Sequence, residues 1–430
     1  MASDLSKSLG ERAWAREPVP VDLGRMRRER HARLQAAMAD QGVEVAVLLH
    51  GPHVAYATGR PVTGADVTQV VVRRPVAVVV AGHDRPHLLE PDPVVAEAVA
   101  AGGDVEVHPG AAVELDEGVA ALGRALAAVA GPLAGRRVAV DAQTGAMLRA
   151  GVPAGPAAPD AGAAGEAAPA DGVGDAASVV AAAKIVKTAD ELACIDRAQR
   201  ANEEAMAATR RALRPGATRA DVAGVFLAEL ARLGAGANLI DPIFQPMPRT
   251  VAAGPRTTTG DVAFPTGVGN PTFGEGDVVW VDTGIDHLGY ASDFGRTWIV
   301  GRDPDAAERE LFARWCAVMA AVLDTLAPGA TGGDLCRAAE AAAGGERPWL
   351  PHFYLAHGVG VESAEMPLVG TDLGPPFDDR LVLAPGMVLV LEPAVWEDGA
   401  GGYRAEEVVT VTDDGWAHLG GNCGYGEFGP

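Results

Sequence analysis

The sequence has few cysteines, few basic residues relative to acidic ones, and no apolar run of membrane-spanning length. Its 430 residues include 4 Cys without a Cys-x-x-Cys pair, which argues against a disulfide framework and a thiolate zinc site. The 35 Lys+Arg are outnumbered by 57 Asp+Glu, giving a net charge of −22, and this excludes nucleic acid and anionic membranes as partners. Apolar runs are interrupted by Arg124 or Lys184, and the first residues lack a signal-peptide core. We therefore expect a cytoplasmic globular protein.

The hydrophobic content of 48% and the charged content of 21% are typical of a packed protein. Residues 151–177 are almost all Ala, Gly, Pro and Asp, a composition that buries little side-chain area and cannot hold a long helix. We expect two domains, residues 1–177 and 178–430. Thr188 and Glu191 form a capping-box pattern that predicts a helix near the start of the second domain.

The hydrophobic periodicity predicts a different class for each domain. The first domain is expected to be α/β, with helices over 26–41 and 113–133 and strands over 43–49, 67–80, 105–108 and 137–141. The second is expected to be α+β, with helices near 188–213, 218–233, 304–326 and 333–343 and strands near 278–283, 296–301, 387–392 and 405–412.

Two aspartates follow an apolar strand in the second domain. Asp282 ends the run VVWVD, and Asp293 follows eleven residues later, with Gly284 and Gly289 between them. A hairpin here would bring the two carboxylates across from one another. Two acids beside a turn are often solvated, but the apolar approach to Asp282 favours burial, and a buried carboxylate needs a partner or a metal.

Three further residues follow the same pattern of polar groups at the ends of apolar strands. His357 lies in AHGVG, Glu392 ends VLVLE, and Glu406 precedes VVTV. Together with the two aspartates they carry a charge of about −4, which is too much to bury without compensation. Two divalent cations would balance it, and oxygen ligands with one imidazole suit manganese, cobalt, iron or zinc.

The order of these residues resembles the five-ligand pattern of the M24 metallopeptidase family. These pita-bread enzymes include Xaa-Pro aminopeptidase, prolidase, methionine aminopeptidase and creatinase. The matching elements are Asp282, eleven residues, Asp293, then His357-Gly-Val-Gly, Glu392-Pro and Arg404-Ala-Glu406. The start of the second domain, AAKIVKTADEL, resembles the family's entry to its catalytic domain, and AYATG at residues 55–59 resembles part of the creatinase-type domain that precedes it. The resemblance implies a creatinase-like α/β domain followed by a pita-bread α+β catalytic domain.

The resemblance also implies roles for individual residues. The metal ligands would be Asp282, Asp293, His357, Glu392 and Glu406, holding two divalent ions, with manganese expected first. A bridging hydroxide would attack an amide carbonyl, and Glu392 would accept the proton of the bridging water. Arg404 would orient a ligand carboxylate. Family members with this N-terminal domain are commonly oligomeric, so a homodimer is expected.

Two family positions are different in this sequence. Where the peptidases carry a second histidine that contacts the substrate carbonyl, the run HGVGVESAEMP has Ala364, followed by Glu365. Glu365 would contact a substrate amine, brace the metal site or form a structural salt bridge. No histidine occurs between His108 and His287, so the upstream substrate histidine, expected near 257–266, is also missing. Either another group, such as His287 or His352, replaces these donors, or the substrate is not an ordinary peptide.

Three functions are consistent with this pattern. The leading hypothesis is a dinuclear metal-dependent hydrolase similar to Xaa-Pro aminopeptidase or dipeptidase, acting on short peptides or small amides. The second is a specialised small-molecule hydrolase or lyase on the same fold, similar to creatinase, ectoine hydrolase or the dimethylsulfoniopropionate lyases. The third is a non-catalytic binding protein, which the complete ligand set disfavours.

Overall fold

The computed structural model describes residues 2–61, 74–113, 115–142, 147, 174–237, 243–250 and 270–421. The chain forms two compact units. The first unit comprises Val21–Lys184, and the second comprises Met1–Pro20 together with Ile185–Pro430.

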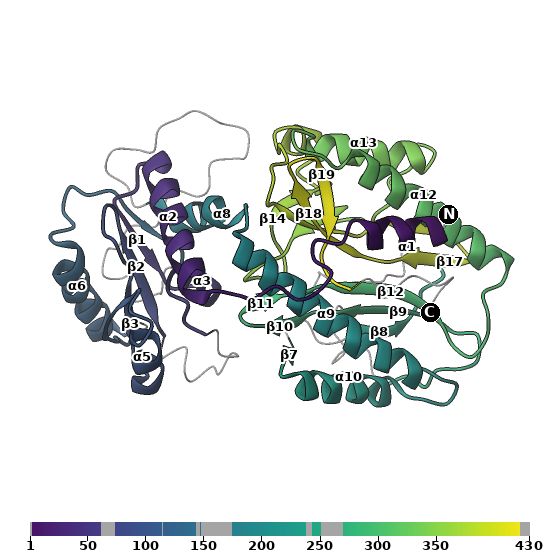
Figure 1. Ribbon diagram of the computed structural model, residues 1–430, viewed down its shortest axis with the longest axis horizontal. Helices are drawn as coiled ribbons and strands as arrows, with labels where there is room; N and C mark the ends of the chain where they lie inside the picture. The colour runs from purple at the N-terminus through teal and green to yellow at the C-terminus, as the bar shows by residue number, and fades with distance from the viewer. Residues whose placement is uncertain are drawn as a thin grey trace. The chain divides into compact units, whose positions relative to one another are not determined.

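The first unit is a mixed six-stranded sheet with helices on both faces (Figure 1). The strand order is β4-β3-β2-β1-β5-β6, with antiparallel pairs β1–β2 and β2–β3 and parallel pairs elsewhere. The strands are β1 (Val45–Leu48), β2 (Val76–Val80), β3 (His87–Glu90), β4 (Glu106–Pro109), β5 (Val138–Val140) and β6 (Gly174–Asp175). The helices are α2 (Leu23–Gln41), α3 (Gly51–Thr58), α5 (Pro93–Ala100), α6 (Asp116–Ala130) and α8 (Ala176–Lys184).

Alternating apolar residues on the central strands explain this layering. Val45 and Val47 of β1 share a core with Leu122 and Leu126 of α6, so α6 covers one face of the sheet. Helix α2 packs against α8 and α3, and Figure 1 shows α2 on the opposite side of β1 and β2 from α6. The expected helix over 26–41 is confirmed as α2, which starts earlier because Asp22 caps it by accepting from the Arg25 N–H.

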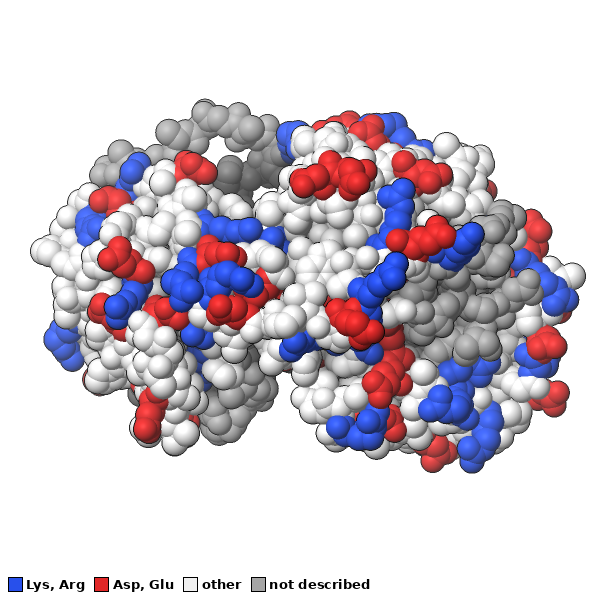
Figure 2. Space-filling model, viewed as in Figure 1, with Lys and Arg blue, Asp and Glu red and all other residues white. Residues whose placement is uncertain are grey.

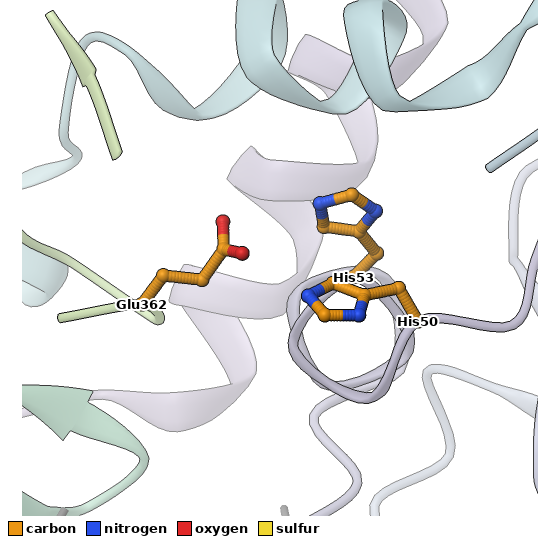
Figure 3. Close-up of side chains that lie close together, drawn as sticks. All are labelled: His50, His53 and Glu362. Carbon is orange, nitrogen blue, oxygen red and sulfur yellow. The ribbon is translucent and has the colours of Figure 1, made fainter. Parts of the chain in front are cut away.

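A single carboxylate ties α3 to the sheet. Asp141, which follows β5, accepts hydrogen bonds from the N–H groups of Leu49 (2.7 Å) and His50 (3.1 Å), and it pairs with Nδ1 of His53 at 2.8 Å. Figure 3 shows His50 and His53 at the start of α3, with ring centroids 4.7 Å apart. The helix therefore begins at a position fixed by β1 and β5.

The described residues of the second unit form four small sheets. Their strand orders are β14-β13-β15-β18-β19, β12-β9-β8, β11-β10-β7 and β16-β17. The strands are β7 (Gly236–Ala237), β8 (Ile243–Pro246), β9 (Val278–Thr283), β10 (Ile285–His287), β11 (Tyr290–Ala291), β12 (Phe294–Ile299), β13 (Ala356–Gly358), β14 (Glu365–Val369), β15 (Val388–Leu391), β16 (Ala394–Glu397), β17 (Gly401–Arg404), β18 (Glu407–Thr412) and β19 (Gly415–His418). The helices are α1 (Ala2–Glu11), α9 (Ala189–Ala212), α10 (Arg219–Leu233), α12 (Ala306–Thr325), α13 (Gly332–Ala342) and α14 (Pro375–Asp378).

Two helix pairs cover these sheets (Figure 1). Phe226 of α10 and Phe244 of β8 belong to the core that α9 and α10 form with β9 and β12. Trp315 of α12 and Val409 of β18 belong to a second core, which α12 and α13 form with β15 and β18. Each of the four helices starts with a capping box: Thr188 with Glu191, Thr218 with Asp221, Asp305 with Glu308, and Thr331 with Asp334.

The compact units differ from the expected domain limits of 1–177 and 178–430. Helix α8 stays with the first unit because it packs on α2, and the Tyr56 hydroxyl donates a 2.9 Å hydrogen bond to the Ala183 carbonyl. Helix α1 belongs to the second unit because Leu5 and Leu9 are buried in the core beside α12. The division therefore falls at 20/21 and 184/185.

Parts of two expected segments lie outside the residues that the structure describes. Residues 67–73 of the expected strand 67–80 and residues 151–173 of the Ala/Gly/Pro-rich segment lie outside the described residues.

Among the residues that are described, no helix is both long and apolar enough to cross a membrane. On the face shown in Figure 2, acidic and basic side chains are interspersed on both units.

Candidate metal centre

The hairpin expected around Asp282 and Asp293 is present. Strands β9 and β12 pair antiparallel, with Asp282 opposite Gly295, and Asp293 immediately precedes β12. Both aspartates are 6% exposed. Their carboxylates lie close to that of Glu406, with one oxygen from each of the three within 4.8 Å of the others. The apolar strand VVWV thus buries Asp282 beside other acids, as its sequence predicted.

The three remaining predicted ligands come from adjacent strands of the five-stranded sheet. His357 lies on β13, Glu392 follows β15, and Glu406 precedes β18. The antiparallel pairing of β15 with both β13 and β18 brings these positions together. Nε2 of His357 lies 3.3 Å from Oδ2 of Asp293 and 3.5 Å from Oε1 of Glu392. All five residues therefore converge on one buried site, and their role as metal ligands stays a prediction.

The orientation of the His357 ring is fixed by the backbone. Nδ1 lies 2.9 Å from the carbonyl oxygen of Gly358, so it carries the proton and donates. Nε2 is then the ring nitrogen directed at the carboxylates of Asp293 and Glu392. Histidine ligands of metals are usually oriented in this way through their other ring nitrogen.

Arg404 contacts three of the four acids. Its NH1 lies 3.2 Å from Oδ2 of Asp282, and its NH2 pairs with Oε2 of Glu392 and Oε1 of Glu406. The guanidinium also lies 4.8 Å from the ring centre of Trp280, a favourable cation–π distance. The sequence predicted contact with one carboxylate, and the structure shows a guanidinium shared among three.

One arginine does not balance this site. Four carboxylates and one guanidinium leave a formal charge of −4 + 1 = −3 in a buried region. Oδ1 of Asp293, Oε1 of Glu392 and Oε2 of Glu406 are buried and have no hydrogen-bond partner among the described residues. Unpaired buried acceptors are costly. Divalent cations would satisfy both the charge and the lone pairs, so the residues fit such ions.

The pKa values of the carboxylates indicate the same excess of buried negative charge. Burial raises the pKa of Asp293 well above its usual value, and the neighbouring charges of Asp282 and Glu392 raise it further. Burial likewise raises the pKa of Glu392 to about 8, although Arg404 and His357 oppose the shift. Burial also raises the pKa of Glu406. The polypeptide alone therefore disfavours the charged form of these acids.

Gly295 makes room for Glu406. A Cβ atom at position 295 would lie 2.5 Å from the carboxyl carbon of Glu406. The backbones are also joined, because the Glu406 N–H donates a 3.0 Å hydrogen bond to the Gly295 carbonyl. Only glycine lets β12 approach the acid this closely.

A layer of polar residues supports the strands that carry the acids. Arg296 donates to the backbone carbonyl of Glu406 at 2.6 Å and to Oε1 of Glu407 at 2.9 Å. The other oxygen of Glu407 pairs with Nε2 of His418 at 2.8 Å. Gln199 of α9 accepts from the Asp293 N–H at 3.2 Å. These contacts fix the backbone on which Asp293 and Glu406 stand.

Glu365 has a partner that the sequence analysis did not assign. Its Oε1 lies 2.5 Å from Nζ of Lys187, and both side chains are almost fully buried. A Cβ on Gly360 would lie 2.6 Å from the same oxygen. Of the roles considered for Glu365, the salt bridge is the one seen in the structure, and it holds the acid against the loop that follows His357.

The histidines considered as replacement donors are placed differently. The side chain of His352 is 82% exposed and pairs with Asp372 at 2.7 Å, so it faces solvent. His287 is half-buried on β10. Ala364 is exposed beside β14. Residues 257–266, where the upstream histidine was expected, lie outside the described residues.

Tyr354 is a polar group of the site that sequence reasoning missed. Its ring centre lies 4.8 Å from that of His357, and the side chain is half-buried. Burial raises the pKa of its hydroxyl, and the charges of Glu392 and Asp293 raise it further. The phenol therefore stays protonated and remains a hydrogen-bond donor. The feature of the sequence that could have identified Tyr354 is its position three residues before His357.

Comparison with known proteins places this site in a family. Residues 193–413 match the model of metallopeptidase family M24, and residues 30–153 match the Creatinase/Prolidase N-terminal domain. The chain belongs to metallopeptidase family M24. All five predicted ligands lie inside the M24 match, so the resemblance drawn from their order is confirmed at the level of the family.

Similar proteins include several M24 peptidases. An uncharacterized peptidase, YqhT, of Bacillus subtilis is 28% identical over 54% of this chain and 61% of its own length. An Xaa-Pro dipeptidase of Pyrococcus furiosus is 29% identical over 55% of this chain and 63% of its own. The chain thus spans less than two thirds of the length of these relatives.

Solved structures confirm the predicted fold class. Dipeptidase PepE from Mycobacterium ulcerans aligns with a TM-score of 0.67 and 22% identity, over 93% of this chain and 97% of the other. The prolidase from Pyrococcus horikoshii aligns with a TM-score of 0.64 and 20% identity, over 91% and 97%. An α/β creatinase-type domain followed by an α+β pita-bread M24 domain is therefore the architecture of this chain.

The contact between Gly295 and Glu406 predicts a specific defect. Gly295→Ala should displace the Glu406 carboxylate and weaken Mn(II) binding by at least about tenfold, measured by equilibrium dialysis. Gly224→Ala is the matched control, because Gly224 has nothing within 4 Å of an added Cβ. Unchanged Mn(II) affinity in Gly295→Ala would contradict the placement of Glu406 in the metal centre.

Proposed function

We propose that this M24 protein is a metal-dependent hydrolase that cleaves short peptides or small amides, with Xaa-Pro peptides as the first candidates. The observation that carries the proposal is the convergence of four buried carboxylates, one guanidinium and one oriented imidazole, with a formal charge of −3. The relatives described as Xaa-Pro dipeptidase and prolidase support the substrate class.

The five converging residues would hold two divalent cations, with manganese as the first candidate. The ligands would be Asp282, Asp293, His357, Glu392 and Glu406. When bound, such ions supply Lewis acidity toward a carbonyl oxygen and lower the pKa of a water molecule. The ligand types also suit cobalt, iron and zinc, so ligand chemistry alone does not select the metal.

The two oxygens of Glu392 have separate roles in this proposal. Arg404 holds Oε2, whereas Oε1 is buried with no hydrogen-bond partner among the described residues. Arg404 therefore orients the carboxylate through Oε2 and leaves Oε1 as the oxygen that would bind a cation, while the Glu392 carboxylate accepts the proton of the attacking water. The proton then passes to the nitrogen that leaves when the amide bond breaks.

Tyr354 is the proposed replacement for the missing family histidines. Cleavage of an amide builds negative charge on the carbonyl oxygen, and a donor aimed at that oxygen speeds the reaction. Tyr354 contacts the ring of His357 and is half-buried, whereas His352 faces solvent. The phenol would thus donate to the developing oxyanion.

The Lys187–Glu365 pair has a positioning role in this proposal. Because Lys187 already neutralises Glu365, the acid is not needed to bind a substrate amine. The pair instead holds Gly360 and the segment after His357 in place. A homodimer and a cytoplasmic location remain predictions from the sequence.

Hydrolysis of Xaa-Pro dipeptides and Xaa-Pro-Yaa tripeptides tests the proposed activity. Metal-stripped protein reloaded with Mn(II) should release the N-terminal amino acid, and a chelator should abolish release. Glu392→Gln should lower kcat by about 10²- to 10⁴-fold, whereas Glu397→Gln, at a side chain that is 64% exposed, should not.

No release by protein with bound Mn(II) would contradict the peptidase proposal. That result would favour the alternative, a specialised small-molecule hydrolase or lyase. The absence of the family histidine at Ala364 is the feature that motivates this alternative.

Tyr354→Phe tests the proposed oxyanion donor on whichever peptide is turned over. Loss of one such donor typically costs about 10²- to 10³-fold in kcat, and KM should change little. Tyr290→Phe is the matched control, since the Tyr290 hydroxyl donates to Glu191 at 2.8 Å. Equal kcat in Tyr354→Phe and the unmodified protein would remove Tyr354 from the mechanism.

A further inference from the structure

Histidines gather at one edge of the sheet in the first unit. Four of the chain's 10 histidines lie there: His31, His83, His87 and His108. None of them contributes to the M24 centre described above. His87 lies on β3 and His108 on β4, the edge strand of the sheet, whereas His31 lies on α2 and His83 lies between β2 and β3.

Strand register brings three possible ligands to one face. Strands β3 and β4 pair in parallel, with His87 opposite Glu106 and Leu89 opposite His108. Glu106 and His108 are two residues apart on β4, so their side chains point to the same face. That face is also the face of His87.

Two of the three distances between the ligand atoms match the edge of a tetrahedral metal site. Nδ1 of His87 lies 3.2 Å from Nε2 of His108 and 3.3 Å from Oε2 of Glu106. A ligand atom from each of the three residues lies within 4.8 Å of the others. Zinc–nitrogen and zinc–oxygen bonds of about 2.0–2.1 Å give tetrahedral edges of about 3.3 Å.

A neighbouring histidine orients the central ligand. Nε2 of His87 lies 3.2 Å from Nδ1 of His83, and the His83 carbonyl lies 2.8 Å from Nε2 of His31. With its proton on Nε2, His87 donates to His83, and its Nδ1 lone pair faces His108 and Glu106. This is the usual arrangement of a histidine ligand and its supporting partner.

We propose that His87, Glu106 and His108 form a second metal site, separate from the M24 centre, that binds Zn²⁺ or a similar transition-metal ion. Two imidazoles and one carboxylate are a common zinc ligand set, with the fourth position left for water. Glu106 is 54% exposed at its side chain, so an ion can enter from solvent. The ion would tie the edge strand β4 to β3.

The competing explanation is a chain of hydrogen bonds among neutral imidazoles. The distances of 3.2 Å from His87 Nδ1 to His108 Nε2 and 3.3 Å to Glu106 Oε2 are close to those at which hydrogen bonds form. Such a chain would need no ion. The two explanations differ in the number of Zn²⁺ ions that the protein binds.

Zinc stoichiometry decides between them. The untagged full chain, stripped of metal and dialysed against Zn²⁺, should bind one equivalent more than His87→Ala or His108→Ala, measured by plasma mass spectrometry. Glu106→Gln is a smaller change at an exposed side chain and should weaken the binding of the additional Zn²⁺ ion by about tenfold or more. This variant tests the site even if a histidine variant does not fold.

Matched variants separate the two metal sites. His352→Ala removes an exposed histidine elsewhere and should keep the full stoichiometry. Asp293→Ala should lose metal from the M24 centre and keep the additional equivalent. Peptide hydrolysis by His108→Ala should equal that of the unmodified protein. Equal Zn²⁺ stoichiometry in the unmodified protein and in Glu106→Gln, His87→Ala and His108→Ala, at every Zn²⁺ concentration, would overturn the proposal.

Discussion

The surplus of buried negative charge in the M24 domain is the constraint around which the surrounding structure is organised. Asp282, Asp293, Glu392 and Glu406 are each no more than 6% exposed, and the guanidinium of Arg404 contacts three of them. Burial of this kind is tolerated only when partners or cations compensate it. The donor set, the orphaned oxygens and the protonated Nδ1 of His357 all serve the same end, which is to present lone pairs to cations.

The fold meets this constraint by placing each acid at the end of a buried strand. Strands β9 and β12 supply Asp282 and Asp293, and β15 and β18 supply Glu392 and Glu406. Strand interiors then provide rigid apolar support, while strand ends leave the carboxylates accessible to one another. Gly295 permits the close approach of the two sheets at Glu406. The helices contribute less directly, as when Gln199 of α9 holds the Asp293 N–H.

Much of this centre could be predicted because its signals are local. An apolar strand that ends in an acid, and a glycine-containing hairpin, are visible within a dozen residues, and the capping box of Thr188 and Glu191 marked the start of α9. The missed features are pairings between distant segments. Lys187 meets Glu365 across 178 positions, and His87 meets Glu106 only through the register of β3 and β4. Strand β3 itself, HLLE, is too short to show a period. The placement of α1 in the second compact unit depends on its packing against α12, which lies far along the chain.

The measurement that tests the central claim most directly is anomalous X-ray scattering at the manganese edge from crystals of Mn(II)-loaded protein. The account predicts two anomalous peaks enclosed by Asp282, Asp293, His357, Glu392 and Glu406. A crystal soaked in Mn(II) that shows no peak among these residues, with Arg404 still bound to three carboxylates, would contradict it.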